Sequence, residues 1–331
     1  MIHKKIKKKD DKIIAVFVLF EVLIFLILIL SIVMPSMGII LAGVGEDNVT
    51  LSAILQIGNS PPEFTSITIN SGSSIDLTPN STTTVIVDII ARDYNGEDDI
   101  SNITAEFFDN SASFYGDGDD NNYHYTNSSC SIDTSYGDIT EVNATCSFEV
   151  EYYANNATWN LTALITDNSS LSDLDSNTQT VNTLLAFALP DTIDYGEVNA
   201  TAVSLEKIAN VTNMGNVEVN LSLSGYAVNA GDGNAMKCTM GFVKNISIDY
   251  AKYNLTSSTP GILTLSQFEA DYTNLTSNVA VKEFDLGYRQ NDTDSTADAI
   301  NQTYWRIYVP LGVAGSCSGN IVFGAVQAGG S

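Results

Sequence analysis

The feature that most constrains this chain is one long apolar run near its N-terminus. Ile13–Val33 comprises 21 positions that are apolar except for Glu21 and Ser31. As a helix rising 1.5 Å per residue, the run would extend about 31 Å, which matches the core of a bilayer. Apolar regions of cleaved signal peptides are usually shorter, about 7–15 residues. We therefore expect a retained transmembrane signal anchor within residues 13–45. Small residues just beyond the run leave a cleaved signal segment as the alternative.

Charge around this run predicts its orientation. Six lysines lie within residues 1–12, which we interpret as a basic cytoplasmic head. Residues 46–331 would then be extracellular in a single-pass protein of the cell membrane, or secreted if the segment is cleaved. The lipid bilayer is the expected partner of Ile13–Val33. No second apolar run of this length follows, so we expect a single membrane crossing.

The overall charge excludes one class of function. Acidic residues number 39 against 14 basic ones, for a net charge of -25. A surface of this sign repels phosphate backbones, so we expect no nucleic-acid binding.

Asparagine placement suggests modification after export. The motif Asn-x-Ser/Thr, with x other than Pro, occurs 16 times, whereas random order of the same residues would give about 6. The excess predicts N-glycosylation, although Asn/Thr-rich strand surfaces also generate such sequons by composition alone. The asparagines concerned are Asn48, Asn80, Asn102, Asn127, Asn143, Asn156, Asn160, Asn168, Asn199, Asn210, Asn220, Asn245, Asn254, Asn274, Asn291 and Asn301.

The four cysteines also fit an exported chain. Their even number predicts disulfides, for which three pairings exist. We expect Cys130–Cys146 and Cys238–Cys317, because each pair then stays within one proposed domain.

Alternation of apolar and polar residues replaces helical periodicity after Gly45. It predicts half-buried antiparallel strands at 146–152, 158–166 and 217–224. The first two would be joined as a hairpin through Tyr153–Ala157. Further strands are expected at 83–90, 102–108, 201–211, 304–309 and 320–326. The predicted organisation is a stalk at 46–62, one β-sandwich at 63–186 and a second at 187–328.

Three segments carry a resemblance to known surface proteins. YYANNATWNLTALITDNSSLS resembles the late strands of Ig-like domains in microbial surface proteins. IANVTNMGNVEVNLSLSG, with Asn213-Met214-Gly215-Asn216, resembles a hairpin of extracellular Ig-like modules, and YWRIYVPLGVAGSCSGNIVFGAV resembles C-terminal segments of archaeal surface proteins. The resemblance implies Ig-like sandwiches at the cell surface. Together with the alternating pattern and the apolar run, it gives the expected fold class, which is all-β: tandem Ig-like antiparallel β-sandwiches after an N-terminal transmembrane or signal-anchor helix. It carries over no catalytic residue.

Catalytic motifs are scarce in the exported part. His124 is its one histidine and lies in the polar run DGDDNNYHYTNSS, which predicts a surface loop. Cys317 occupies the centre of a Gly-flanked turn that a disulfide explains better than a nucleophile. We therefore expect no enzyme and no resident cofactor other than a cation.

Two acidic loops are candidates for calcium, which prefers several oxygen ligands on a flexible loop. The first supplies Asp93, Asn95, Glu97 and Asp98, and the second supplies Asp117 and Asp119. The alternative is an ordinary Asp/Asn/Gly turn without metal.

The function expected is therefore structural or adhesive display at the cell surface, with other surface proteins or glycans as partners. One alternative is a pilus-like filament, in which Val49–Ile57 pairs as a donated strand with the next subunit and the chain self-associates. Another is a carbohydrate-binding module that uses some of the 15 tyrosines as platforms.

Overall fold

The computed structural model describes residues 51–290 and 299–329. The predicted cytoplasmic head and membrane segment lie outside these ranges. Within them, every helix is too short or too polar to cross a bilayer. Contacts divide the chain into two units, Met1–Ile57 and Gly58–Ser331. The second unit contains two separate hydrophobic cores, one on either side of residues 184–187.

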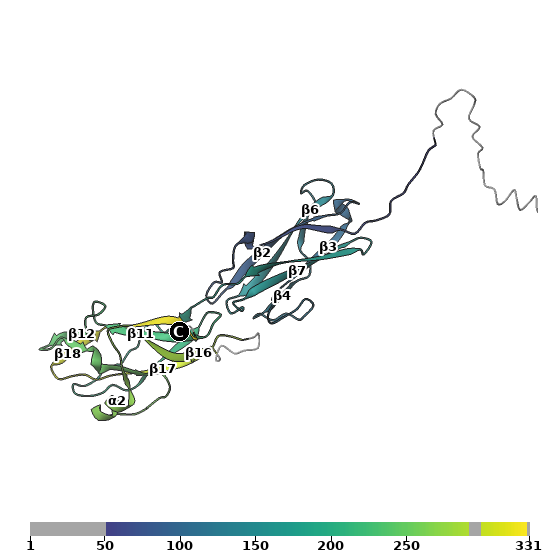
Figure 1. The fold of residues 1–331 in the computed structure, drawn as a ribbon. Helices are drawn as coiled ribbons and strands as arrows, with labels where there is room; N and C mark the ends of the chain where they lie inside the picture. The colour runs from purple at the N-terminus through teal and green to yellow at the C-terminus, as the bar shows by residue number, and fades with distance from the viewer. Residues whose placement is uncertain (1–50, 291–298, 330–331) are drawn as a thin grey trace, which may run out of the picture. The chain divides into compact units, whose positions relative to one another are not determined.

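The first core lies between two antiparallel four-stranded sheets (Figure 1). One sheet has the order β1-β2-β6-β5 and the other has the order β4-β3-β7-β8. Their bounds are β1 (Glu63–Ile69), β2 (Thr82–Arg92), β3 (Ile100–Asp109), β4 (His124–Asn127), β5 (Ser131–Asp133), β6 (Glu141–Glu151), β7 (Thr158–Asp167) and β8 (Ser172–Thr180). Short 3-10 turns, η1 (Asn70–Gly72) and η2 (Glu97–Asp99), flank β2.

The alternating pattern explains why these residues form a sandwich. In β2, Val85, Val87, Ile89 and Ala91 are fully buried, while the residues between them are exposed or half-buried. The predicted strands at 83–90, 102–108, 146–152 and 158–166 are confirmed as β2, β3, β6 and β7. Most of their predicted boundaries lie within about two residues of the observed ones, and β6 begins earlier than predicted.

The predicted hairpin at Tyr153–Ala157 is wrong. β6 pairs with β2 and β5, whereas β7 pairs with β3 and β8. The connection therefore crosses from one sheet to the other. Tyr153 and Ala154 are fully buried, which is unusual for a hairpin tip but natural for a segment that closes the end of a core.

The second core lies between a five-stranded sheet and two three-stranded sheets. The five-stranded order is β15-β14-β17-β10-β9, and the others are β16-β11-β19 and β13-β12-β18. Their bounds are β9 (Phe187–Ala188), β10 (Lys207–Asn213), β11 (Val219–Tyr226), β12 (Asn234–Gly241), β13 (Asn245–Ser247), β14 (Ala251–Asn254), β15 (Thr273–Asn274), β16 (Ala280–Leu286), β17 (Ile300–Ile307), β18 (Val313–Ser318) and β19 (Asn320–Gln327).

The chain before β10 differs from the predicted strand at 201–211. Residues 189–206 form what we call the strap, which has no regular strand. Its end is held at residues 307–309 by an isolated bridge, Val203 to Tyr308, and by neighbouring backbone hydrogen bonds. The expected hairpin at Asn213–Asn216 is also a crossing between sheets, since β10 pairs with β9 and β17 while β11 pairs with β16 and β19.

Side-chain hydrogen bonds explain why asparagines occupy this crossing. Asn213 is fully buried and donates to Val217 O at 2.8 Å, while its own oxygen accepts from Gly215 N at 2.9 Å. Asn216, also fully buried, donates to the carbonyls of Ala154 and Asn182. Buried backbone groups require such partners, so the side-chain amides of Asn213 and Asn216 fix the crossing between β10 and β11.

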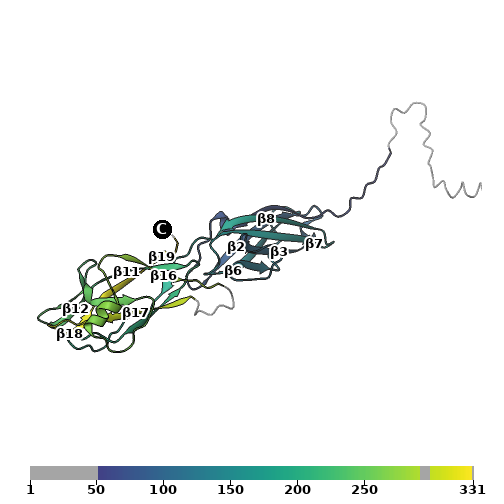
Figure 2. The ribbon, with the colours of Figure 1, turned by 60° about the horizontal axis from the view of Figure 1, so that its bottom comes forward.

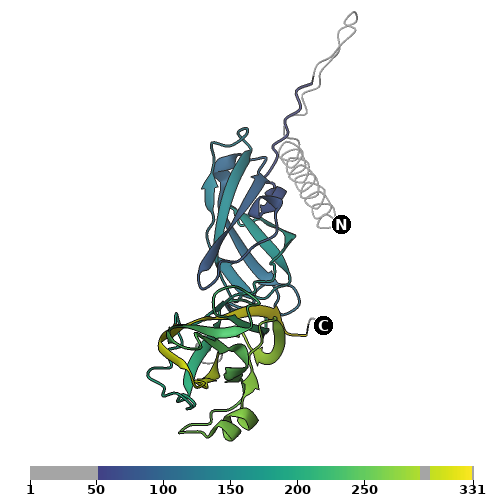
Figure 3. The ribbon, with the colours of Figure 1, turned by 90° about the vertical axis from the view of Figure 1, so that its left-hand side faces the viewer.

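One short helix, α2 (Leu265–Asp271), packs on the five-stranded sheet and is drawn in green in Figures 2 and 3. Its first turn has a capping box between Thr264 and Gln267. Phe268 is fully buried, and Glu269 accepts from the buried Lys252 of β14 at 2.5 Å. Another 3-10 turn, η3 (Ile248–Tyr250), precedes β14.

Both expected disulfides are present. Cys130 is linked to Cys146, and Cys238 is linked to Cys317. Cys130 lies between β4 and β5, where the chain passes from one sheet of the first sandwich to the other. Cys238 and Cys317 are direct partners on the paired strands β12 and β18.

Candidate functional site

Three carboxylates gather at one end of the first sandwich. Asp93 follows β2 directly, Asp99 is the last residue of η2, and Asp167 is the last residue of β7. One carboxylate oxygen from each lies within 4.8 Å of the others. β2 and β7 are inner strands of different sheets, so the cluster lies where the two layers meet at this end of the sandwich.

Two of these side chains are withdrawn from solvent. Asp93 is 0% exposed and Asp167 is 2% exposed. Oδ1 of Asp93 accepts from the backbone N–H of Asn95 at 2.8 Å, but its Oδ2 is buried without a hydrogen-bond partner among the described residues. Burial raises the pKa of Asp93 above its usual value, and the carboxylates of Asp99 and Asp167 raise it further.

Asp167 is better satisfied than Asp93. Its Oδ1 accepts from the backbone N–H groups of Ser169 and Leu171, at 2.8 and 2.7 Å. Its Oδ2 accepts from the side-chain amide of Asn59 at 2.6 Å. The next residue, Ser60, donates from its N–H and its hydroxyl to Oδ1 of Asn95, at 2.8 and 2.9 Å. The segment that enters the first sandwich is thus tied to the residues around the cluster.

The structure brings together a set of acidic residues that differs from the one predicted. Of the first predicted loop, Asp93 is in the cluster, whereas Asn95 accepts hydrogen bonds from Ser60. The cluster contains Asp99 of the same loop rather than the predicted Glu97 and Asp98. In the second predicted loop, Asp117 caps the backbone N–H of Phe114, and Asp119 belongs to no three-residue acidic cluster in the described part of the chain. Asp167 was missed because it lies 74 residues from Asp93. Its local signal, Asp-Asn-Ser-Ser at a strand end, is that of an ordinary turn.

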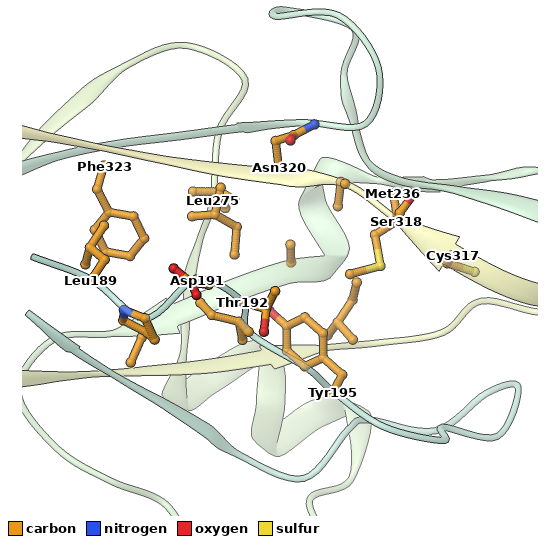
Figure 4. Close-up of a pocket in the computed structure, with 18 residues that line it drawn as sticks. Leu189, Asp191, Thr192, Tyr195, Met236, Leu275, Cys317, Ser318, Asn320 and Phe323 are labelled. Atoms are coloured by element: carbon orange, nitrogen blue, oxygen red, sulfur yellow. The ribbon is translucent and has the colours of Figure 1, made fainter.

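A cavity of about 370 Å³ lies in the second sandwich beneath the strap. Figure 4 shows Asp191, Thr192 and Tyr195 of the strap on one side, with Ser318 and Asn320 across the cavity. Apolar side chains from the three sheets, from the strap and from the residue after β15 line the rest: Ile193, Met236, Leu275, Ile307, Ile321 and Phe323. The cavity therefore has a mixed lining, with polar and apolar surface in similar proportion.

The hydroxyl of Tyr195 is the one polar atom at this cavity that is buried without a partner among the described residues. Burial raises the pKa of this phenol above its ordinary value, so it remains a neutral donor. An ordered water at this cavity could accept from the Tyr195 hydroxyl and find its other partners among polar lining residues such as Thr192 and Asn320.

His124 is not in a surface loop, contrary to the prediction. It opens β4, is fully buried and stacks on Phe108 with ring centroids 5.4 Å apart. Its Nδ1 is 2.8 Å from Oγ of Ser113, and its Nε2 is 3.4 Å from Oε2 of Glu106. These residue types occur in hydrolase triads, but Ser113 is also buried, so a substrate could not reach its hydroxyl.

The asparagines of the sequons have a consistent placement. Fourteen of the 16 lie in the described ranges, and each of these is exposed or half-buried. The three fully buried asparagines of the described part are Asn122, Asn213 and Asn216, and none of them is in a sequon.

Comparison with known proteins gives only distant likenesses. No family model and no curated protein matches the chain. A structure of carbohydrate-binding modules from the β-sandwich superfamily is 12% identical, with 82% of this chain and 100% of that chain covered and a TM-score of 0.24. A chaperone–tip adhesin complex of CFA/I fimbriae is 10% identical over 82% and 92%, with a TM-score of 0.29. The C-terminal domain of the Streptococcus agalactiae AgI/II polypeptide BspA is 10% identical over 77% and 91%, with a TM-score of 0.22. TM-scores this low carry no conclusion about function.

Proposed function

We propose that this chain is a membrane-anchored, N-glycosylated surface protein without catalytic activity, which displays Ig-like β-sandwiches outside the cell for a structural or adhesive role. Its partners would be other surface proteins or glycans. The anchor would be the apolar run Ile13–Val33.

The placement of the sequon asparagines is the observation that carries this proposal. An oligosaccharide needs an asparagine side chain that solvent can reach, and all fourteen described sequon asparagines meet this requirement. Sequons that arose by chance composition would also fall on buried asparagines, yet Asn122, Asn213 and Asn216 lie outside them. Two disulfides support an oxidising compartment as well.

Strand order supports the Ig-like assignment of the first sandwich. In the lettering of the immunoglobulin fold, one sheet carries strands A, B, E and D, and the other carries C, F and G with an added C′. Lettering β1, β2, β3, β4, β5, β6, β7 and β8 as A, B, C, C′, D, E, F and G reproduces both orders here. Such sandwiches serve as rigid display modules on many cell surfaces.

A filament subunit is the second candidate, because the described part of the predicted donor segment, residues 51–57, forms no strand. Residues 51–62 precede β1 and contain no strand. Leu51, Ile54, Leu55 and Ile57 are 80–97% exposed, which is unusual for four large apolar side chains in one short segment. An extended segment of this kind can complete a sheet in another subunit.

Fractionation of native cells separates the two candidates. Intact cells would be treated with protease, and a parallel sample would be sheared, pelleted and extracted with detergent. The anchored protein is expected to be digested from outside and to leave the membrane only with detergent. A filament would appear in the sheared supernatant as polymers that persist on dilution. Protein that remains undigested, while a known surface marker is cut, would contradict both.

A further inference from the structure

We propose that Asp93, Asp99 and Asp167 bind one calcium ion, which fastens Asn59 to the first sandwich. The inference goes beyond surface display and holds whether the chain is an anchor or a filament subunit. Its starting point is the buried Oδ2 of Asp93, which has no hydrogen-bond partner in the described part of the chain although it belongs to a cluster of three carboxylates.

Charge within the cluster requires compensation. Asp93 and Asp167 are almost fully buried, and buried carboxylates are normally paired with a cation or coordinate a metal. Arg92 is the basic neighbour in sequence, but it donates to Glu141 and lies over the ring of Tyr94. Backbone N–H groups satisfy Oδ1 of Asp93 and Oδ1 of Asp167. Oδ2 of Asp167 accepts from the amide of Asn59, whereas Oδ2 of Asp93 has no hydrogen-bond partner in the described part of the chain.

The donor set indicates calcium. All three side chains offer oxygen, and neither imidazole nor thiolate is present in the cluster. Calcium binds oxygens at about 2.3–2.6 Å, so two ligands on opposite sides of the ion are about 5 Å apart. The three carboxylate oxygens, which lie within 4.8 Å of one another, fit around one ion within that limit. Waters would complete the six to eight ligands that calcium takes.

Asn59 provides a fourth oxygen. Its side-chain N–H now donates a hydrogen bond to Oδ2 of Asp167 at 2.6 Å. The nitrogen and oxygen of an amide exchange places by a rotation of the side chain, and structures at ordinary resolution assign them from their partners. With calcium bound to Asp167, the oxygen of Asn59 would face the ion instead. Calcium would then connect β2, β7 and the entering segment, and it would stiffen the point at which the chain reaches the sandwich.

The experiment measures calcium binding to the full chain in detergent after dialysis against EGTA. Calorimetric titration with calcium chloride up to about 10 mM should show one equivalent bound, and magnesium chloride should bind at least about tenfold more weakly. Asp99→Asn should weaken calcium binding at least about tenfold, because one charged ligand is lost. Asp98→Asn is the matched control, since it removes an exposed carboxylate from the same loop, and it should change the affinity by less than about twofold.

Thermal melting distinguishes an ion ligand from a merely structural aspartate. In EGTA, Asp99→Asn should melt at the same temperature as the wild type or higher, because repulsion among the carboxylates is relieved. In calcium the wild type should melt at a higher temperature than Asp99→Asn. Calcium should also slow amide hydrogen exchange in the peptide containing Asn59 and Ser60, in the wild type but not in Asp99→Asn. Three results would each overturn the proposal: no binding by the folded wild type, equal losses in Asp98→Asn and Asp99→Asn, or equal affinity for magnesium.

Discussion

Replacing Arg306 by lysine should lower the free energy of unfolding of the second sandwich by about 3–5 kcal/mol. Arg306 lies on β17 and is fully buried. Its neighbours in the strand, Trp305 and Ile307, belong to the core, so the guanidinium points to the opposite face of the sheet. There it is covered by the strap, by the residues before α2 and by the end of α2.

All three nitrogens of this guanidinium donate hydrogen bonds. Nε donates to the hydroxyl of Tyr272 at 3.0 Å, and one terminal nitrogen donates to Ser204 O at 2.6 Å. The other donates to Thr259 O and Gly261 O, at 2.5 and 3.0 Å. Lysine offers a point charge that cannot reproduce this fork, so buried carbonyl groups would lose their donors.

Denaturant unfolding of the full chain, followed by tryptophan fluorescence, measures the loss. Trp305 reports on the second core and Trp159 on the first. Arg92→Lys is the matched control, because Arg92 is partly exposed and pairs with Glu141 at the surface, where a change should cost no more than about 1 kcal/mol. Equal, small effects of Arg92→Lys and Arg306→Lys would show that the buried guanidinium does not hold the strap and α2 on the sheet.

Removing the disulfide of the second sandwich should cost more than removing that of the first. Cys238 and Cys317 are 79 residues apart, whereas Cys130 and Cys146 are 16 apart. In the chain-entropy model the longer loop gives about 4.5 kcal/mol of stabilisation and the shorter one about 3 kcal/mol. The longer link also joins β12 to β18, which pair although β13 to β17 lie between them in sequence.

The comparison uses two double variants, Cys238→Ala/Cys317→Ala and Cys130→Ala/Cys146→Ala, each in the full chain. Alanine avoids placing an unsatisfied hydroxyl at the buried Cys146. Melting of both variants and of the reduced wild type would be followed by calorimetry. The reverse order of losses would mean that local packing, rather than loop closure, determines what these bonds contribute.

Much of the strand pattern could be predicted because alternation records burial directly. Val219, Leu221 and Leu223 face the core of the second sandwich as the period of two requires. Which strands become neighbours could not be predicted in the same way. The segments at Tyr153–Ala157 and Asn213–Asn216 have the short, polar look of hairpin turns, yet both cross between sheets, and their pairing depends on contacts remote in sequence.

The candidate cation site was predicted only in part for the same reason. Asp93 follows an obvious strand and lies in an acidic loop, so local sequence was enough to select it. Asp167 joins it through the packing of two sheets, which no local pattern records. His124 was misplaced because its neighbours are polar. β4 has only four residues, and His124 and Tyr125 are both buried, so the strand shows no alternating pattern.

Glycopeptide mapping of the protein from its native cells tests the surface assignment most directly. Mass spectrometry should find sugar on the eight exposed sequon asparagines, and it should find all four cysteines oxidised, because both modifications require export. These asparagines are Asn80, Asn156, Asn168, Asn199, Asn210, Asn245, Asn274 and Asn301. Unmodified asparagine at all eight positions, together with free thiols at the four cysteines, would contradict display of this chain outside the cell.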